Sequence, residues 1–252
     1  MEHQSPKIRA VAVSYLNTKP MTFAFEHGAM REALSLEFKY PSLLADELIS
    51  GRADMGLVPV ATIPSIAGAR IISDYCIGAD GEVASVCIFS HVPLEEAVSL
   101  ILDYQSRTSV ALTKILLSKY WKLSPNLIAA EPGYEYNIQG NTAALIIGDR
   151  ALEMRNSFEY VYDLGLAWKA MTGLPFVFAA WVANKELPGS FLQSFNSEIG
   201  NSIQQLDSII AAHPFPHYDL HTYYQKNIQY KLDESKRKSM ELFWELINAQ
   251  EV

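Results

Sequence analysis

Short apolar segments that alternate with helical segments are the feature that most constrains the fold of this chain. Segments such as Ile8–Val13 and Met55–Val58 are apolar and end in polar or proline-containing turns. A helical segment follows the first of these, with Pro20 at a position typical of a helix start. Such alternation predicts an open α/β fold with right-handed crossovers, because strand, helix and next strand build a parallel sheet.

This pattern continues to about residue 183 and then changes. Further strands are predicted at Val83–Phe89, Ala143–Ile147 and Phe176–Val182, and a helix capped by Thr108 or Ser109 is predicted at Val110–Trp121. From Pro188 onward the pattern is mainly helical to the end. The sequence therefore predicts an α/β protein with a helical C-terminal segment.

Charge and hydropathy exclude several classes of partner. The 252 residues include 20 Lys and Arg against 28 Asp and Glu, a net charge of −8, which argues against a nucleic-acid partner. The apolar stretch Ala10–Val13 is too short for a signal peptide, and Leu174–Ala183 is too short to span a membrane. We therefore expect a soluble, cytoplasmic protein without a membrane partner, and no sequence feature specifies an oligomeric state.

No metal or nucleotide motif is found. Cys76 and Cys87 form no paired-cysteine motif and are expected to be buried, reduced thiols. His213, His217 and His221 are spaced four apart, but the prolines between the first two would break a helix that presented them together. Glycine-rich phosphate loops, zinc-hydrolase motifs and serine-hydrolase elbows are also absent. We expect no metal.

The segment Ser106, Arg107, Thr108 and Ser109 is a candidate anion site. Ligands of open α/β sheets bind at the carboxyl ends of strands, and this polar segment lies directly before the predicted helix from Val110. Free backbone N–H groups, hydroxyls and a guanidinium would suit a carboxylate or a phosphate. The alternative is an ordinary helix cap beside a solvated arginine.

Three further positions are candidates, each with a plain structural alternative. Asn17 ends the turn after the first strand and could orient a hydroxyl or stabilise an enolate oxygen, or it could simply form a turn or cap. Ser85 lies in a strand that is otherwise apolar, and its hydroxyl needs either a backbone or a ligand partner. Gly148 forms a tight turn, after which Asp149 could cap the next helix without any ligand.

Several separated motifs carry a family resemblance. The turn after the first strand reads V-S-Y-L-N-T-K-P over Val13–Pro20. Further motifs follow in order: D-M-G-L-V-P-V at Asp54–Val60, V-A-S-V-C-I-F-S at Val83–Ser90, S-R-T-S-V-A-L at Ser106–Leu112, A-L-I-I-G-D-R-A at Ala144–Ala151 and D-L-G-L-A-W-K-A-M-T-G-L-P-F-V-F-A-A-W at Asp163–Trp181. From about Ile8 to Ala183 the chain resembles the chorismate dehydratase family, which opens the futalosine route to menaquinone.

The resemblance implies a fold with two lobes. The family is similar to type II periplasmic-binding proteins, in which two α/β lobes joined by two crossing strands clamp a ligand in the cleft between them. Lobe one would comprise residues 1–89 and 178–252, including the C-terminal helices, and lobe two residues 90–177. The crossings would lie at Phe89–Val92 and Phe176–Phe178.

The resemblance also implies a reaction. A carbon–oxygen lyase of this family converts chorismate into 3-[(1-carboxyvinyl)oxy]benzoate and water. The ring C3–H leaves as a proton and the C4 hydroxyl as water, and the gain of aromaticity drives the step. Because no redox step occurs, no nicotinamide, flavin, metal or other cofactor is implied.

Ten residues are assigned to the site through this resemblance. The catalytic ones are Asn17 and Ser85, and the substrate-binding ones are Ser14, Tyr15, Ser106, Arg107, Thr108, Ser109, Gly148 and Asp149. Residues 106–109 would hold a substrate carboxylate, and the turn at 14–17 would hold the ring substituents, with Asn17 stabilising charge as the proton leaves. Ser85 would bind the departing hydroxyl or the second carboxylate, and residues 148–149 would close the pocket from lobe two.

The general base and two rival functions stay open at this point. No His or Glu of the motifs has an obvious basic role, so one hypothesis gives the C3 proton to the substrate's own enolpyruvyl carboxylate. One rival is a solute-binding or sensing protein for a small carboxylate on the same fold. The other is the sister 1,4-dihydroxy-6-naphthoate synthase, whose first turn, of Ser-Pro-x-Pro-Asn-Asp type, differs from Ser14–Asn17.

Overall fold

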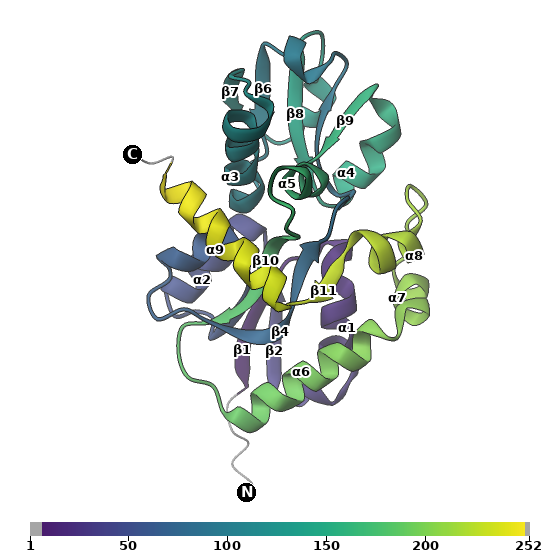
Figure 1. Ribbon diagram of the computed structural model, residues 1–252. Helices are drawn as coiled ribbons and strands as arrows, with labels where there is room; N and C mark the ends of the chain where they lie inside the picture. The colour runs from purple at the N-terminus through teal and green to yellow at the C-terminus, as the bar shows by residue number, and fades with distance from the viewer. Residues whose placement is uncertain (1–6, 250–252) are drawn as a thin grey trace, which may run out of the picture.

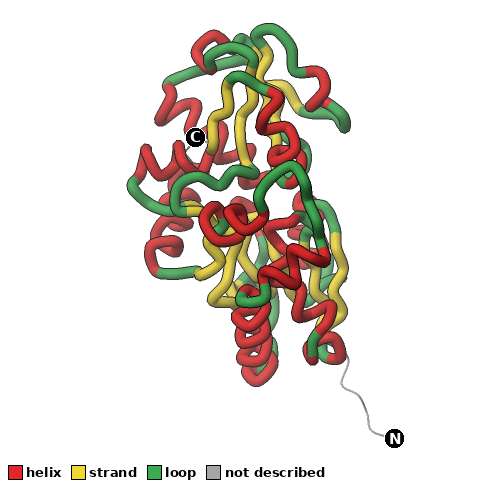
Figure 2. The backbone as a smooth tube through the Cα atoms, turned by 90° about the vertical axis from the view of Figure 1, so that its right-hand side faces the viewer, coloured by secondary structure: helices red, strands yellow, loops and turns green. Residues whose placement is uncertain are grey.

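The computed structural model describes residues 7–249 as two lobes stacked along the long axis of the molecule (Figure 1). Over these residues the strands form two sheets, one in each lobe. Figure 2 shows the strands of the two sheets above and below a waist through which the chain passes. This arrangement confirms the predicted α/β fold with two lobes. No helix among residues 7–249 is both long enough and apolar enough to cross a membrane.

The sheet of lobe one is mixed and has the strand order β11-β4-β10-β3-β1-β2. The strand bounds are β1 (Ile8–Ala12), β2 (Leu34–Phe38), β3 (Met55–Pro59), β4 (Arg70–Ala79), β10 (Phe176–Ala183) and β11 (Gln229–Lys231). β1 runs parallel to β2 and β3, whereas β10 runs antiparallel to β3 and β4. The chain thus re-enters lobe one through β10, in the middle of the sheet.

The sheet of lobe two has the order β7-β6-β8-β5-β9. Its strands are β5 (Val86–Ser90), β6 (Ser99–Leu102), β7 (Asn126–Ala129), β8 (Thr142–Ile147) and β9 (Tyr160–Asp163). β6 is parallel to β7 and β8, and β5 is antiparallel to β8 and β9. β5 and β9, the first and last strands of this lobe, lie side by side, so the chain enters and leaves lobe two at neighbouring points.

Helices cover both sheets (Figure 1). Those of lobe one are α1 (Lys19–His27), α2 (Pro41–Ile49), α6 (Gly189–Ile203), α7 (Leu206–Ala212) and α8 (Leu220–Thr222), and those of lobe two are α3 (Arg107–Leu116), α4 (Asp149–Met154) and α5 (Leu164–Thr172). Short 3-10 segments lie at η1 (Leu16–Thr18), η2 (Ala29–Glu32), η3 (Val60–Ser65), η4 (Leu94–Glu96), η6 (Tyr134–Asn137) and η7 (Arg155–Ser157), and π-helical turns lie at η5 (Leu117–Trp121) and η8 (Tyr223–Asn227).

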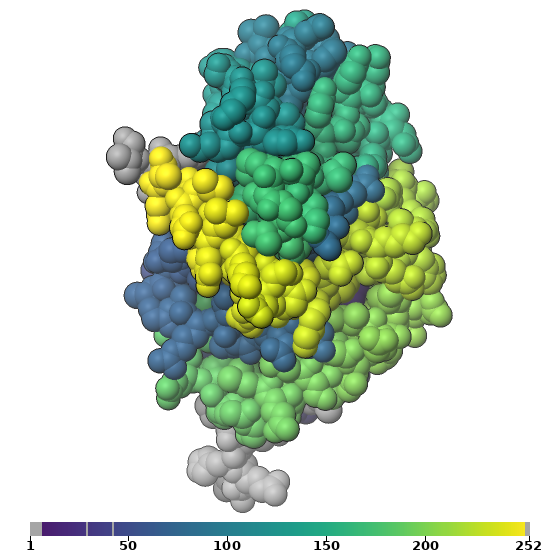
Figure 3. Space-filling view, in the orientation of Figure 1, coloured from purple at the N-terminus to yellow at the C-terminus, as the bar shows by residue number. Residues whose placement is uncertain are grey.

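The C-terminal helix α9 (Glu234–Asn248) packs at the waist and holds the lobes together. Figure 3 shows it, in yellow, against the green α5. The indole N–H of Trp168 in α5 donates to the Ser239 hydroxyl of α9 over 2.9 Å. The ring of Phe243 packs edge-on against those of Trp168 and Phe176, with centroids 6.0 and 5.0 Å apart. Burial of these aromatic side chains therefore stabilises both lobes and the contact between them.

Sheet membership places the first crossing earlier than expected. Phe89 lies inside β5, which pairs with β8 and β9 in lobe two, so the predicted crossing at Phe89–Val92 is wrong. The chain instead crosses at residues 80–85, between β4 and β5. Phe176 already pairs with Ala79 in lobe one. The lobe boundaries at residues 89 and 177 stay predictions, and we use sheet membership to name the lobes below.

The first crossing carries a strained residue that one carboxylate supports. Ala84 has a φ of 63°, in the region that favours glycine. The buried Asp163, at the end of β9, accepts hydrogen bonds from the backbone N–H of Val83 at 3.1 Å and of Ala84 at 2.8 Å. It also caps α5 by accepting from Leu166 N–H at 3.0 Å. Asp163 thus connects the first crossing to the N-terminus of α5.

Candidate active site

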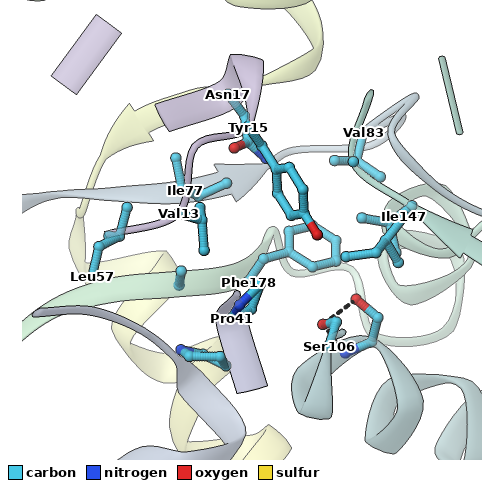
Figure 4. A pocket seen from close by; sticks show the side chains of 15 residues that line it. Val13, Tyr15, Asn17, Pro41, Leu57, Ile77, Val83, Ser106, Ile147 and Phe178 are labelled. Carbon is cyan, nitrogen blue, oxygen red and sulfur yellow. Dashed lines mark hydrogen bonds between the residues drawn. The ribbon is translucent and has the colours of Figure 1, made fainter. Parts of the chain in front are cut away.

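A cavity of about 520 Å³, counting the part open to solvent, lies between the two lobes. Its walls are mainly apolar, and Figure 4 shows Leu57, Ile77, Val83, Ile147 and Phe178 around it. The polar side chains on the wall belong to Tyr15, Asn17, Ser106 and Ser109. Among the lining residues in the described part of the chain, none is an Asp, Glu, His, Lys or Arg. The cavity suits a small apolar ring with a few polar substituents.

The N-terminus of α3 forms one end of the cavity. This helix begins at Arg107 and not at Val110, because Ser106 is extended and its hydroxyl caps the helix. The Ser106 Oγ accepts from Ser109 N–H at 3.1 Å and donates to Ser109 Oγ at 2.9 Å (Figure 4). The prediction of Thr108 or Ser109 as the cap is therefore wrong. The N–H groups of Arg107 and Thr108 in the first turn have no intrahelical acceptor, so this end of α3 offers donors to an anion.

Arg107 and Thr108 point to lobe one and do not line the cavity. The half-exposed Arg107 guanidinium lies 3.9 Å from the Asp46 carboxylate in α2. The Thr108 hydroxyl accepts a hydrogen bond from Ala61 N–H in η3 at 3.1 Å. Both residues thus connect the lobes in this structure, and their predicted contact with a substrate carboxylate stays a prediction.

The turn after β1 supplies the opposite wall. Tyr15 and Asn17 line the cavity, whereas Ser14 is exposed and borders a neighbouring surface groove beside Lys39. The Tyr15 hydroxyl donates to the side-chain oxygen of Gln105 in lobe two. Burial raises the pKa of Tyr15 well above its usual value, so its phenol stays protonated at neutral pH. Tyr15 can therefore donate a hydrogen bond but cannot act as a base.

Asp149 holds the same turn from lobe two. Its Oδ1 accepts from Leu16 N–H at 3.0 Å, and it makes no capping bond within α4, so the prediction of a helix cap is wrong. Gly148 has a φ of 68°, and a Cβ at this position would lie 3.2 Å from the Tyr15 ring. Glycine thus lets Tyr15 pack closely on lobe two. Asp149 and Gln105 together bind one turn of lobe one to lobe two.

Titration of Asp149 should be visible in the stability of the protein. Burial raises its pKa to about 6, although the Leu16 N–H opposes this shift. Between about pH 4 and 6 the folded state binds more protons at this group than the unfolded state. The contribution of Asp149 to the free energy of unfolding is therefore fully present below about pH 4, and it is lost as the pH rises through about 6.

We expect Asp149→Asn to remove this dependence, because asparagine does not titrate and can still accept from Leu16. The free energy of unfolding of the wild type should fall relative to Asp149→Asn by about 2–3 kcal/mol between pH 4 and 7. Urea unfolding of both proteins across this range measures the difference. Parallel profiles would contradict the prediction.

Ser85 lies behind the cavity wall. It sits in the bend before β5 and not within the strand, and it is fully buried. Its hydroxyl accepts from the Tyr223 hydroxyl at 2.7 Å, and its carbonyl accepts from Gly148 N–H at 2.8 Å. The protein itself therefore supplies a partner for this hydroxyl. The neighbouring Val83 and Val86 line the cavity, and Ser85 does not.

Sequence reasoning missed a buried charged network that supports Gln105. Asp103 accepts from the Gln105 N–H at 2.6 Å, from the Tyr134 hydroxyl at 2.7 Å and from Arg150 Nη2 at 2.6 Å. Arg150 also lies 3.5 Å from the Glu135 carboxylate. The sequence did contain a signal for Arg150, because this residue directly follows Asp149 in one of the motifs that carry the family resemblance. Across residues 7–249 no cluster of His, Cys, Asp or Glu could hold a metal ion.

Comparison with known proteins gives matches that cover nearly the whole chain. A family model described as menaquinone biosynthesis matches residues 8–249. A protein named chorismate dehydratase from Thermus thermophilus is 26% identical over 260 residues, which cover 92% of this chain and 92% of that relative.

Solved structures share the fold at low sequence identity. Protein AF1704 from Archaeoglobus fulgidus matches with a TM-score of 0.78 and 13% identity, over 99% of both chains. The alkanesulfonate-binding protein SsuA from Xanthomonas axonopodis pv. citri, solved with bound MOPS, matches with a TM-score of 0.65 and 11% identity, over 98% of this chain and 94% of that one. These matches confirm the predicted fold, which is like that of periplasmic-binding proteins.

Proposed function

Because this chain belongs to the menaquinone biosynthesis family, we propose that it is a chorismate dehydratase, a carbon–oxygen lyase that converts chorismate into 3-[(1-carboxyvinyl)oxy]benzoate and water. The observation that carries the proposal is the family match over residues 8–249, together with the relative named for this activity. The cavity between the lobes, with apolar walls and donors at one end, supports it. The substrate is a small molecule with one ring and two carboxylates.

We place one substrate carboxylate at the N-terminus of α3. There the N–H groups of Arg107 and Thr108 and the Ser109 hydroxyl are donors, and Ser109 lines the cavity. A helix N-terminus contributes about 0.3–1 kcal/mol to binding an anion, and about 2 kcal/mol where it is partly buried. Each neutral hydrogen bond adds about 0.5–1.5 kcal/mol. The apolar walls would then hold the ring.

The reaction requires removal of a proton and loss of a hydroxyl. The C3–H bond breaks and its electron pair forms the C3–C4 double bond. The C4–O bond breaks at the same time, and the departing oxygen takes up the proton lost from C3, so that it leaves as water. Negative charge develops on the ring system as the proton leaves. The Asn17 side chain lies on the cavity wall, where its N–H donor would stabilise this charge. The gain of aromaticity supplies most of the driving force.

The proton acceptor in this mechanism is the substrate's enolpyruvyl carboxylate. Among the described residues that line the cavity, Tyr15 has the one titratable side chain, and its raised pKa keeps it protonated. Asp149 follows the lining residue Gly148, but its Oδ1 is bound to Leu16 N–H and it does not line the cavity. A base carried by the substrate therefore fits this wall better than a protein base.

Incubation of the purified protein with chorismate tests the proposal. We expect an aromatic product, seen as a change in ultraviolet absorbance, whose mass is lower than that of chorismate by one water. Asn17→Ala, prepared in parallel, controls for contaminating activity and for spontaneous decay. Binding of chorismate without turnover would contradict the enzyme proposal and favour a binding or sensing protein on the same fold.

A further inference from the structure

Gln105 lies in lobe two and contacts the turn of lobe one that carries Asn17. It is buried, and it directly precedes Ser106, the residue that caps α3. Its side-chain oxygen accepts a hydrogen bond from the Tyr15 hydroxyl of lobe one. Tyr15 lines the cavity, and Gln105 does not. The side chain of Gln105 therefore acts on the cavity wall through Tyr15.

Tyr15 and Asn17 belong to one closed turn, and Figure 4 shows both side chains on this segment. The Tyr15 carbonyl accepts from Thr18 N–H at 3.0 Å, which closes the turn around Asn17. The Thr18 hydroxyl donates to the Asn17 side-chain oxygen at 3.2 Å. The place of Tyr15 therefore sets the place of the Asn17 amide on the cavity wall.

Lobe two holds Gln105 at two points. The Gln105 backbone N–H donates to Asp103 Oδ1 at 2.6 Å. The side-chain nitrogen donates to the Tyr104 hydroxyl at 3.0 Å, so the amide oxygen is the group that faces Tyr15. Both the backbone and the side chain of Gln105 are thus fixed by its own lobe.

Arg150 holds both of these partners. Its Nη2 donates to the buried Asp103 carboxylate at 2.6 Å, and its guanidinium carbon lies 5.6 Å from the centre of the Tyr104 ring. Tyr134 adds a second hydrogen bond to Asp103, at 2.7 Å. A buried ion pair contributes little net stability compared with apolar packing, because both ions lose their water. What this cluster does fix is the position of Gln105.

We propose that Gln105 is a positioning residue, which holds Tyr15 so that the Asn17 amide stays in place across the cavity from the N-terminus of α3. The proposal rests on the proposed function, since it concerns the charge that Asn17 stabilises during turnover. Gln105 lies outside the cavity wall and acts on the reaction through Tyr15. Its loss should therefore change the rate of turnover more than the binding of substrate.

Steady-state kinetics of Gln105→Leu test this role. Leucine keeps most of the buried volume and the backbone N–H that Asp103 binds, so the variant removes the side-chain bonds and leaves the Asp103 cluster in place. We expect kcat on chorismate to fall about tenfold, near the upper value for one hydrogen bond. KM should change less than about twofold, because α3 still binds the substrate.

Hydrogen exchange provides a measurement that needs no activity. The N–H groups of Leu16 and Thr18 each have an acceptor at 3.0 Å, so both report on the turn. We expect the peptide that covers residues 14–18 to exchange about tenfold faster in Gln105→Leu, while peptides from β1 and α3 exchange as in the wild type. A variant that is merely less stable would exchange faster throughout, and its kcat per folded enzyme would be unchanged.

Tyr15→Phe removes the same bond from the side of lobe one, so the exchange test holds even where Gln105→Leu fails to fold. We expect it to speed exchange of residues 14–18 by a similar factor, and the double variant to exchange no faster than the faster single variant. Gln139→Leu is the matched control. Gln139 is exposed in lobe two and does not line the cavity, so its kcat and its exchange at residues 14–18 should equal those of the wild type.

The outcomes separate this inference from the proposed function. A wild-type protein that leaves chorismate unchanged contradicts the proposed function, and the role of Gln105 in turnover with it. An active wild type whose kcat is matched by Gln105→Leu contradicts the role of Gln105 alone. Unchanged exchange of residues 14–18 in Gln105→Leu, or in Tyr15→Phe where only that variant folds, also overturns the inference, because Gln105 would then not hold the turn.

Discussion

Replacement of Asn17 by alanine should lower kcat on chorismate by about 10²- to 10³-fold, the loss expected when one donor to a developing anion is removed. The side chain lies on the cavity wall, where Asn17 is the amide among the polar groups. Asn17→Asp should lower kcat further, because it places a carboxylate where negative charge develops. Initial rates of aromatic product formation, with circular dichroism to verify folding, measure both effects.

Asn126→Asp is the matched control for the change in charge. Asn126 is exposed in β7 of lobe two and does not line the cavity, so this variant should keep the wild-type kcat. A wild-type rate in Asn17→Ala would contradict the role of Asn17.

Asn17→Asp also tests the source of the base. A chorismate analogue without the enolpyruvyl carboxylate should be inert with the wild type if that carboxylate takes the C3 proton. The new carboxylate at position 17 should then restore measurable turnover of the analogue. If the wild type already processes the analogue, a protein group is the base, and the substrate-assisted mechanism is wrong.

Replacement of Asp163 by alanine should lower the free energy of unfolding by about 3–5 kcal/mol. The carboxylate is buried and accepts hydrogen bonds from the N–H groups of Val83, Ala84 and Leu166, which would lose their partner. Each buried donor without an acceptor costs about 1–3 kcal/mol, and the strained backbone at Ala84 loses its support. Urea unfolding followed by circular dichroism measures the loss.

Asp80→Ala is the control for Asp163→Ala. Asp80 lies in the same crossing but is exposed, and its partner is the Lys169 ammonium at 2.6 Å. An exposed ion pair of this kind contributes at most about 1 kcal/mol, so this variant should stay close to the wild type. Equal losses in the two variants would contradict the role given to Asp163.

The fold could be predicted where the sequence carries a local period or a family motif. The strands at Ile8–Ala12 and Thr142–Ile147 were expected almost at their observed bounds, and the family match confirms the resemblance. β4, at Arg70–Ala79, was missed, because Ser73 and Asp74 interrupt its apolar residues. β11 was missed because three residues are too short for any period.

The candidate site was predicted as a set of segments and less well as a set of side chains. Tyr15, Asn17, Ser106, Ser109 and Gly148 line one cavity, as a shared site requires. Arg107 and Thr108 lie beside Ser106 in the sequence and yet face lobe one. Successive residues of a helix point about 100° apart, so a start at residue 107 in place of 110 redirects each side chain of the motif.

The sequence by itself determined the family, the α/β class and the turns that reach the cavity, because these depend on motifs, periods and turn residues that are local in the chain. Only the tertiary structure decided which polar groups face the cavity, which connect the lobes, and that Tyr223 lies behind Ser85. Those relations join residues 138 or 133 positions apart. They arise from the packing of two lobes and a C-terminal segment, which no local pattern specifies.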